Sequence, residues 1–351
     1  MNKIKVRRDW IDALRAIAML NVMIWHMSNG LQSQWIYSVG TASLMIPLFF
    51  SITGYVFNDC NGEVWIFSKK LIKYLVIPWI ILSLAKGFII AVLKGGGVGY
   101  YFEFILNLFN GKNLWYFPCC IIAQILHFYV IKISNNRIFR VIIYSCILSL
   151  GGLILSRFSL FDYLNISTAF ICQFFLLLGY IMRYNLYLFN GFNQIVGLSS
   201  SNNRFKFCFL CIMCMSYLLL ICMQCKLFPN NIPFDVHHNY YISWFVVILI
   251  IIGVFTIFIL FNSIKSYPKL LSFIGKNTIV FYVFHYDSLI ILSSLFSLLG
   301  ITIENSWMFV FVKVIWSIFI CSIISIIFNK YIPFVVGRRS YHINTKEKVP
   351  S

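Results

Sequence analysis

Charged residues are scarce in this chain, and acidic ones are the scarcest. Only 11% of its 351 residues are charged, with 10 Asp and Glu in total, whereas 60% are hydrophobic. A soluble domain carries roughly 25% charged and 45–50% apolar residues, so this composition excludes an ordinary soluble fold. The chain also lacks a low-complexity linker that would divide it into separate units. The composition therefore predicts an integral membrane protein built around one membrane domain.

Long apolar runs are what the chain has instead. Each is close to the ~20 residues that a helix needs to cross a bilayer. They occupy residues 12–28, 37–57, 71–93, 114–132, 138–156, 166–184, 207–224, 241–261, 275–297 and 306–328. We therefore predict an all-α, multi-pass transmembrane helical bundle of about ten spans.

The positive charge is distributed unevenly along the chain. The 28 Lys and Arg give a formal net charge of +18, which in a soluble protein would suggest nucleic-acid binding. In membrane proteins such residues collect in cytoplasmic loops. Here the loops on the opposite side hold only Lys94, Lys112, Arg157, Lys226 and Lys313. We predict cytoplasmic termini, a transmembrane domain over residues 1–330, a basic tail over 331–351, and no nucleic-acid partner.

The cysteines and two loop histidines raise the question of a metal site. Of the 11 cysteines, five repeat at helical spacing on the seventh span: Cys208, Cys211, Cys214, Cys222 and Cys225. One helix cannot easily wrap such ligands around a tetrahedral metal, and a buried Cys behaves as a small hydrophobe. The spacing of His237 and His238 near Asp235 matches no standard ligand set either. We expect no metal.

A cation and a histidine share one face of the first span. Ten residues separate Arg15 from His26, so a helix brings the two side chains to within ~20° of each other and ~16 Å apart along its axis. Ionisable groups in lipid are costly, which makes this pair a candidate functional site. Asp12 lies three residues before Arg15 and either orients it or complements the helix dipole.

Lysines at the start of the third span form a second candidate site. Lys70 and Lys73 are three residues apart at the predicted cytoplasmic edge, where two ammonium groups on one helix face would suit a polyphosphate ligand. The alternative is that they are ordinary positive-inside residues. Gly54 in the second span permits a close helix approach, and Pro78 can open a kink, both of which are common in spans that build a cavity.

The ninth span carries a second intramembrane histidine. His285 lies nine residues after Lys276, about 13 Å along a helix and so near the bilayer midplane. A lone helical histidine is usually a core residue, but two at mid-depth favour a function. By contrast, we expect Lys86 and Lys313, toward the outer ends of their spans, to reach the interface.

Taken in order, these motifs resemble those of the acyltransferase-3 family of membrane proteins. The matching segments are Asp12-x-Leu14-Arg15-x10-His26, Phe49 Phe50 Ser51 Ile52 Thr53 Gly54 Tyr55, the lysines before Pro78, Leu114 Trp115 Tyr116 Phe117, and Gly275 through Tyr282 Val283 Phe284 His285. The resemblance runs from the N-terminus to about residue 290. It implies a ten-span membrane acyltransferase, and many members of the family O-acetylate bacterial cell-surface polysaccharides.

The resemblance also implies roles for individual residues. His26 corresponds to the family's catalytic histidine, Arg15 to its signature arginine, Asp12 to its acidic partner and His285 to its late histidine. Arg15, Lys70 and Lys73 would hold the phosphates of an acyl-CoA donor, most simply acetyl-CoA. The basic pair is usually arginine in the family, which weakens the expected bidentate grip. Asn113 stands where a histidine often precedes the Leu-Trp motif, and Thr53 replaces the usual serine.

The expected function is transfer of an acyl group from cytoplasmic acyl-CoA to a hydroxyl of a surface glycan or its lipid-linked precursor, in the bacterial inner membrane. His26 would act either as the general base or as a covalent acyl carrier. A transporter or flippase of a lipid-linked glycan is the main alternative, because buried charges in many spans also suit transport. A glycan polymerase is less favoured, because the loops near 94–113 and 225–240 are modest.

Overall fold

Every regular element that the structure describes is a helix. The computed structural model describes residues 9–28, 35–93, 97–158, 163–183, 203–227, 244–264, 266–300 and 306–336. The helices are α1 (Asp9–Met27), α2 (Trp35–Val56), α3 (Val64–Leu71), α4 (Ile77–Leu93), α5 (Gly97–Phe109), α6 (Tyr116–Ile133), α7 (Ile138–Leu155), α8 (Ile166–Ile171), α10 (Asn203–Leu227), α11 (Trp244–Ser263), α12 (Lys269–Lys276), α13 (Thr278–Phe284), α14 (Ser288–Leu298) and α15 (Trp307–Tyr331). Shorter helical elements are η1 (Cys60–Gly62), the π-helix η2 (Ile72–Val76) and η4 (Pro333–Val336). The predicted all-α class is confirmed.

Each of the ten apolar runs contains helix, but not all of them form a straight span. Among the described residues, five helices are long and apolar enough to cross a membrane: Val64–Val92, Tyr116–Ile133, Ile138–Leu155, Val246–Ser263 and Trp307–Tyr331. Two bent pairs raise this number to seven: Tyr163–Ile171 with Gln173–Arg183, and Thr278–Phe284 with Ser288–Leu298. These helices indicate a multi-pass membrane protein. The count of ten and the side of the termini stay predictions.

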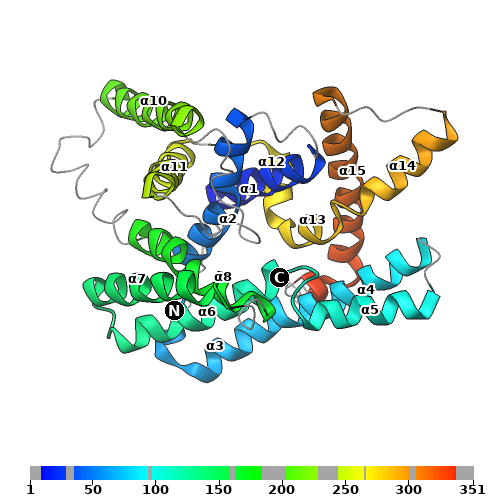
Figure 1. Cartoon of the computed structure of the whole chain (residues 1–351), viewed down its shortest axis with the longest axis horizontal. Coiled ribbons are helices and arrows are strands. Elements are labelled where there is room, and N and C mark those ends of the chain that lie inside the picture. The colour runs from blue at the N-terminus through cyan, green and yellow to red at the C-terminus, as the bar shows by residue number, and fades with distance from the viewer. Residues whose placement is uncertain are drawn as a thin grey trace, which may run out of the picture.

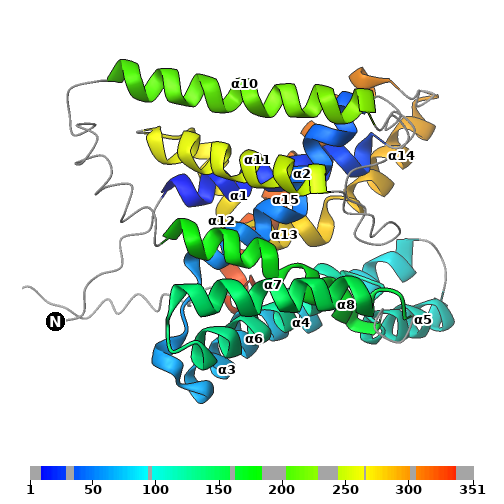
Figure 2. The same cartoon turned by 60° about the vertical axis from the view of Figure 1, so that its left-hand side comes forward.

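The helices form two groups that meet at the middle of the molecule. Both views show α3–α8 in one half and α1 with α10–α13 in the other (Figures 1 and 2). Helix α15 runs from one half toward the other and contacts α1, α13 and α14. Helix α2 contacts α1, α10 and α11. The first span, which carries Arg15 and His26, therefore lies at the centre and not at the periphery.

Glycines bring backbones into direct contact on either side of α2 and α1. A Cβ atom on Gly54 would lie 2.0 Å from the carbonyl oxygen of Leu176, and one on Gly179 would lie 1.7 Å from that of Ser51. The close approach predicted at Gly54 is thus confirmed, and Ser51 strengthens it by donating a hydrogen bond to the Phe175 carbonyl at 3.0 Å. On the other side, a Cβ on Gly275 would lie 1.7 Å from the carbonyl oxygen of Asp12. Helix α12 is therefore fixed against the turn of α1 that carries Arg15.

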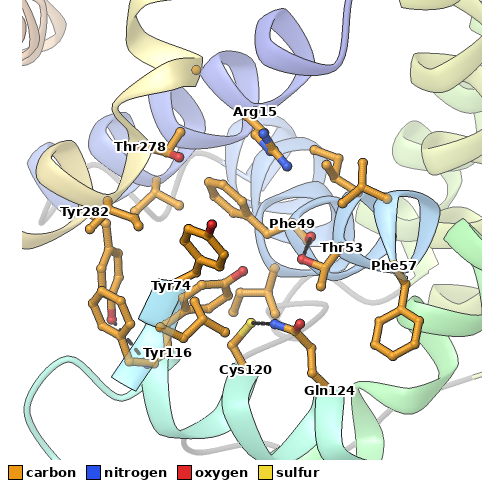
Figure 3. A pocket seen from close by; sticks show the side chains of 18 of the residues that line it. Arg15, Phe49, Thr53, Phe57, Tyr74, Tyr116, Cys120, Gln124, Thr278 and Tyr282 are labelled. Carbon is orange, nitrogen blue, oxygen red and sulfur yellow. Dashed lines mark hydrogen bonds between the residues drawn. The ribbon is translucent and has the colours of Figure 1, made fainter. Parts of the chain in front are cut away.

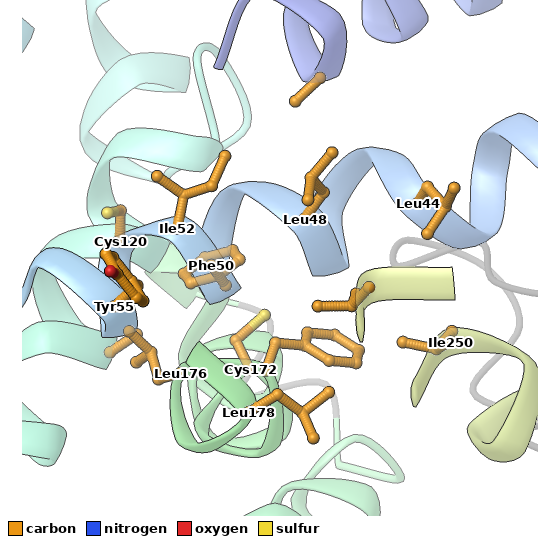
Figure 4. Close-up of a cluster of buried hydrophobic side chains, with 14 of the residues drawn as sticks. Leu44, Leu48, Phe50, Ile52, Tyr55, Cys120, Cys172, Leu176, Leu178 and Ile250 are labelled. Carbon is orange, nitrogen blue, oxygen red and sulfur yellow. The ribbon is translucent and has the colours of Figure 1, made fainter. Parts of the chain in front are cut away.

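Apolar clusters hold these contacts in place. Figure 4 shows one on α2, where Leu48 and Phe50 pack with Cys172 and Leu178 of neighbouring segments. A second cluster joins α1 to the late helices through Met23, Phe281 and their neighbours. Apolar packing and direct backbone contact are the usual means of holding helices together in lipid, where the hydrophobic effect between helices is weak.

Two segments differ from the sequence-based expectation. The loop predicted near residues 94–113 contains helix α5, which packs on α4 with the Phe104 ring against Gly87. Its run of aromatic and aliphatic residues explains why it is helical and packed. At the other end, Val335 and Val336 of η4 are buried, so the described start of the basic tail packs against the helices. Residues 337–351 lie outside the described residues.

Candidate functional site

A cavity of about 710 Å³ lies between the two groups of helices. Its walls come from α1, α2, α3, α6, α12 and α13, together with the π-helix η2 (Figure 3). Three of the lining side chains are cations: Arg15, Lys70 and Lys276. None of the described residues that line it is Asp or Glu. A basic cavity of this volume lies in the range of small-molecule sites and suits an anionic ligand.

Arg15 and His26 both line this cavity, as expected for two residues on one face of α1. The Arg15 side chain is 30% exposed and its Nη1 lies 3.4 Å from Oδ1 of Asp12, which is 1% exposed. Asp12 thus stands behind Arg15 and does not itself line the cavity. His26 lies in the last turn of α1 and is exposed. Its imidazole is accessible because it faces the cavity.

The two predicted donor-binding lysines are separated by the structure. Lys70 lines the cavity, and its Nζ lies 2.9 Å from the Sγ of Cys60. Lys73 is exposed outside the cavity, with its ammonium 5.8 Å from the centre of the Tyr74 ring. The expectation of a shared face assumed a regular α-helix. Helix α3 instead ends at Leu71 and continues as the π-helix η2, whose wider turn changes the direction of Lys73.

His285 lies beside His26, although the two are far apart in sequence. Their ring centres are 5.3 Å apart and their planes are inclined by 41°. The Nδ1 atom of His285 lies 2.9 Å from the Phe281 carbonyl oxygen and 3.0 Å from that of Tyr282. In the neutral ring Nδ1 therefore carries the proton and Nε2 is the acceptor. Nε2 is buried without a hydrogen-bond partner among the described residues.

Lys86 does not reach the membrane interface as expected. Its Nζ lies 3.1 Å from Oδ2 of Asp287, and the two side chains are only 15% and 10% exposed. The expectation failed because Asp287 was not recognised as a partner, 201 residues away in sequence. A buried cation is stable where an opposite charge and hydrogen bonds compensate it. Lys86 thus belongs to the surroundings of the two histidines.

The middle motifs meet at the cavity wall. The backbone N–H of Tyr116 donates to the Tyr282 hydroxyl at 3.2 Å, which gives the first turn of α6 a partner for an otherwise unpaired donor. Thr53 lines the same cavity and donates to the Phe49 carbonyl at 2.9 Å. The segments Leu114–Phe117 and Gly275–His285 are thus neighbours in space.

Some cavity residues were missed from the sequence. The sequence alone assigns no role in the site to Lys276 of α12, or to Gln124 and Cys120 of α6. Gln124 and Cys120 line the cavity together, with Gln124 Nε2 3.2 Å from Cys120 Sγ (Figure 3). The signal for Lys276 was present, because it follows Gly275, which fixes α12 against α1. Gln124 carried no comparable signal.

Within the described part of the chain, the features considered as metal sites do not gather into one. Among the described residues, no group of three or more His, Cys, Asp or Glu is placed to hold a metal ion. On the seventh apolar run, Cys211 and Cys222 are exposed and Cys214 is half-buried. His127 is buried between the rings of Phe57 and Tyr180. His237 and His238 lie outside the described residues.

Comparison with known proteins points to one family. A family model described as an acyltransferase domain, Acyl_transf_3, matches residues 8–326. Three proteins of Staphylococcus aureus, from strains Mu50 / ATCC 700699, MSSA476 and MRSA252, are each 24% identical over 286 residues, covering 78% of this chain and 76% of the relative. Each is named "Probable poly-beta-1,6-N-acetyl-D-glucosamine export protein". No solved structure matches the chain.

The family match covers nearly all the described helices, including every residue of the cavity wall except Val336. It begins before Arg15 and extends past His285. The motif order, the helical membrane architecture and the family match agree with one another. The chain therefore belongs to the acyltransferase-3 family of membrane proteins.

Proposed function

We propose that this protein is a membrane O-acyltransferase that moves an acyl group, acetyl in the simplest case, from cytoplasmic acyl-CoA to a hydroxyl of a cell-surface glycan or its lipid-linked precursor. The observation that carries the proposal is the cavity wall. It combines three cations, no carboxylate among its described residues, and an accessible histidine. Family membership supports acyltransferase activity, and the bacterial inner membrane is the proposed location.

The cations that line the cavity suit the phosphates of the donor. Arg15 and Lys70 come from different helices, α1 and α3, and Lys276 adds a third positive charge from α12. Arginine can hold a phosphate through two parallel hydrogen bonds, while lysine acts as a point charge. Asp12 keeps the Arg15 guanidinium in place from behind. Lys73 would contribute only at the outer edge, because it does not line the cavity.

His26 is the proposed catalytic residue. As the glycan hydroxyl oxygen attacks the thioester carbonyl carbon, His26 takes the hydroxyl proton. The C–S bond then breaks, and the imidazolium returns the proton to the departing CoA thiolate. Proton transfer of this kind contributes typically 10²- to 10⁴-fold in rate. A two-step route, in which the acyl group first bonds to the His26 nitrogen and CoA leaves before the glycan attacks, uses the same groups.

His285 is proposed to assist His26 directly. Its ring centre lies 5.3 Å from that of His26, its Nδ1 is held by two backbone carbonyls, and its Nε2 is left as an acceptor without a hydrogen-bond partner among the described residues. An acceptor there would orient the imidazole of His26 and stabilise the positive charge that it gains during transfer. This is the role that a carboxylate or carbonyl usually has toward a catalytic histidine.

A test uses purified protein, acetyl-CoA and oligomers of β-1,6-linked N-acetylglucosamine, the glycan in the relatives' printed name. The glycan should gain mass in steps of one acetyl group, and mild alkali should remove the gain because esters hydrolyse readily. With the His26→Ala variant, the glycan should gain acetyl groups more slowly by a factor on the order of 10² to 10⁴. If the wild-type protein leaves both acetyl-CoA and a panel of surface glycans unchanged, the transferase proposal is wrong.

Glycan export is the second candidate function, because the relatives are named as export proteins. An exporter would move glycan across a vesicle membrane without consuming acyl-CoA. Proteoliposomes loaded with labelled glycan separate the two functions. Under the transferase proposal, acyl-CoA supplied in the lumen or outside should change only the acylation of the glycan and not its movement across the membrane. Glycan movement in the complete absence of acyl-CoA would favour export.

A further inference from the structure

The span that carries His285 is broken next to that residue. Helices α13 and α14 are bent by 50° at a break over His285, Tyr286 and Asp287. We propose that Lys86 is a positioning residue that clamps this break from α4 and thereby sets the His285 ring against His26. The inference rests on the proposed transferase function and assigns to that site a residue that does not touch substrate.

The clamp consists of two contacts of one ammonium group. Lys86 Nζ donates to the Val283 carbonyl oxygen at 3.0 Å and pairs with Asp287 Oδ2 at 3.1 Å. Val283 precedes His285 by two residues and Asp287 follows it by two. One cation therefore bridges the two sides of the break across His285. Any change in the bend would have to stretch at least one of these contacts.

The break needs such partners because it interrupts helical hydrogen bonding inside an apolar region. Helix α15 supplies hydrogen-bond donors to the break on the side opposite α4. Ser317 Oγ donates to the His285 carbonyl at 3.0 Å, and Trp316 Nε1 donates to the Ser288 carbonyl at 2.9 Å. His285 is thus held between α4, through Lys86, and α15. Of the two attachments, only the one to α4 includes a charge.

Lys86 contacts residues on either side of His285, yet it does not line the cavity. The geometry therefore does not indicate that Lys86 contacts the substrate. The pair is also mostly buried, and a buried ion pair is weak evidence for a purely stabilising role, because apolar replacements of similar size often stabilise a protein as well. Its placement around His285 is better explained by the orientation of the imidazole.

The experiment replaces both Lys86 and Asp287 by uncharged residues, so that an effect on the orientation of His285 can be told apart from an effect on the stability of the fold. Lys86→Met alone would take the Lys86 cation away from the buried Asp287 carboxylate and would lower stability. The double variant Lys86→Met with Asp287→Leu removes both charges. We expect it to unfold at about the wild-type temperature and to keep its KM for acetyl-CoA within about twofold. Its kcat should fall on the order of tenfold to a hundredfold, as when a reacting group is misplaced by about 1 Å.

Two further variants test whether a cation at position 86 is sufficient and whether the effect is specific to that position. Lys86→Arg keeps a cation and a donor at the same position and should restore most of kcat. Lys313→Met is the matched control, since it removes a lysine of the neighbouring helix α15 that does not line the cavity, and its kcat should equal that of the wild type. Both are measured by the rate of acetyl transfer to the glycan and by thermal unfolding.

A double variant with both the stability and the kcat of the wild type would overturn the inference, because the ion pair would then have no role in orienting His285. A raised KM for acetyl-CoA with unchanged kcat would also overturn it, since Lys86 would then belong to donor binding. Failure of the proposed function is a different result: the wild-type protein itself would not transfer acetyl groups.

Discussion

His26 is the residue on which the proposed chemistry depends, and its environment makes its role testable. It lines the cavity from the last turn of α1 and is exposed, so replacing it leaves no apolar void. His26→Ala should reduce acetyl transfer by a factor on the order of 10² to 10⁴, with thermal unfolding close to the wild type. Mass analysis of the glycan measures the loss. Full activity in this variant would refute the assignment.

The two lysines near the start of the third apolar run make separate predictions. Lys70 lines the cavity and Lys73 does not, so Lys70→Ala should raise the KM for acetyl-CoA roughly tenfold, the effect of losing one charge-assisted hydrogen bond of about 1.5 kcal/mol. Lys73→Ala should change it by less than about twofold.

Acetyl-pantetheine serves as the comparison donor for these variants, because it lacks the nucleotide and its phosphates. Its KM should be the same for Lys70→Ala and the wild type. If Lys70→Ala weakens both donors equally, the lysine does not bind phosphate. If Lys73→Ala has the larger effect, the donor enters along a path other than the cavity described.

At the scale of elements, backbone contacts through glycine decide how α1 meets its neighbours. A Cβ on Gly275 would lie 1.7 Å from the carbonyl oxygen of Asp12, so Gly275→Ala must push α12 away from the turn that carries Arg15. We expect a loss of about 1 to 3 kcal/mol of stability, as for other overpacked sites. Thermal unfolding of the purified protein in detergent measures it.

Gly151 of α7 is the matched control for that variant, because nothing lies within 4 Å of a Cβ placed there. Gly151→Ala should leave the unfolding temperature unchanged or raise it slightly, since Ala is the better helix former. Equal effects of the two substitutions would show that the α1–α12 contact is looser than the structure has it.

Some features of the helices can be predicted from the sequence and others cannot. The shared face of Arg15 and His26, and the close approach at Gly54, follow from helical periodicity and from the absence of a side chain, both of which are local properties. Lys73 departs from its expected place because a π-helix is a local irregularity without a clear sequence signal. Lys86 was misassigned because its partner, Asp287, is distant in sequence, and only tertiary packing brings the two together.

The cavity likewise depends partly on local sequence and partly on tertiary packing. Hydropathy predicts which segments are helical, yet the composition of a wall made by six helices depends on their relative rotation. Gln124 faces the cavity for reasons that its own segment does not contain. The His26–His285 pair was suggested only by two histidines at similar depth. Its ring separation of 5.3 Å depends on the bend between α13 and α14.

At the scale of the whole molecule, the proposed transfer from a cytoplasmic donor to a surface glycan requires a defined orientation in the membrane. Positive charge predicts that both termini are cytoplasmic, which implies an even number of spans. A green fluorescent protein fused after Ser351 should fluoresce in bacterial cells, whereas alkaline phosphatase fused there should be inactive. The opposite pattern would place the C-terminus outside the cytoplasm and would contradict the predicted orientation.

The central claim is that one cavity holds the donor with its phosphates at the cations and its thioester at His26. A structure of the protein with a non-hydrolysable acetyl-CoA analogue tests this most directly. We expect phosphate density beside Arg15, Lys70 and Lys276, and the acetyl group within about 3.5 Å of the His26 imidazole, a near-attack distance. A ligand bound outside this cavity, or one whose acetyl group points away from His26, would contradict it.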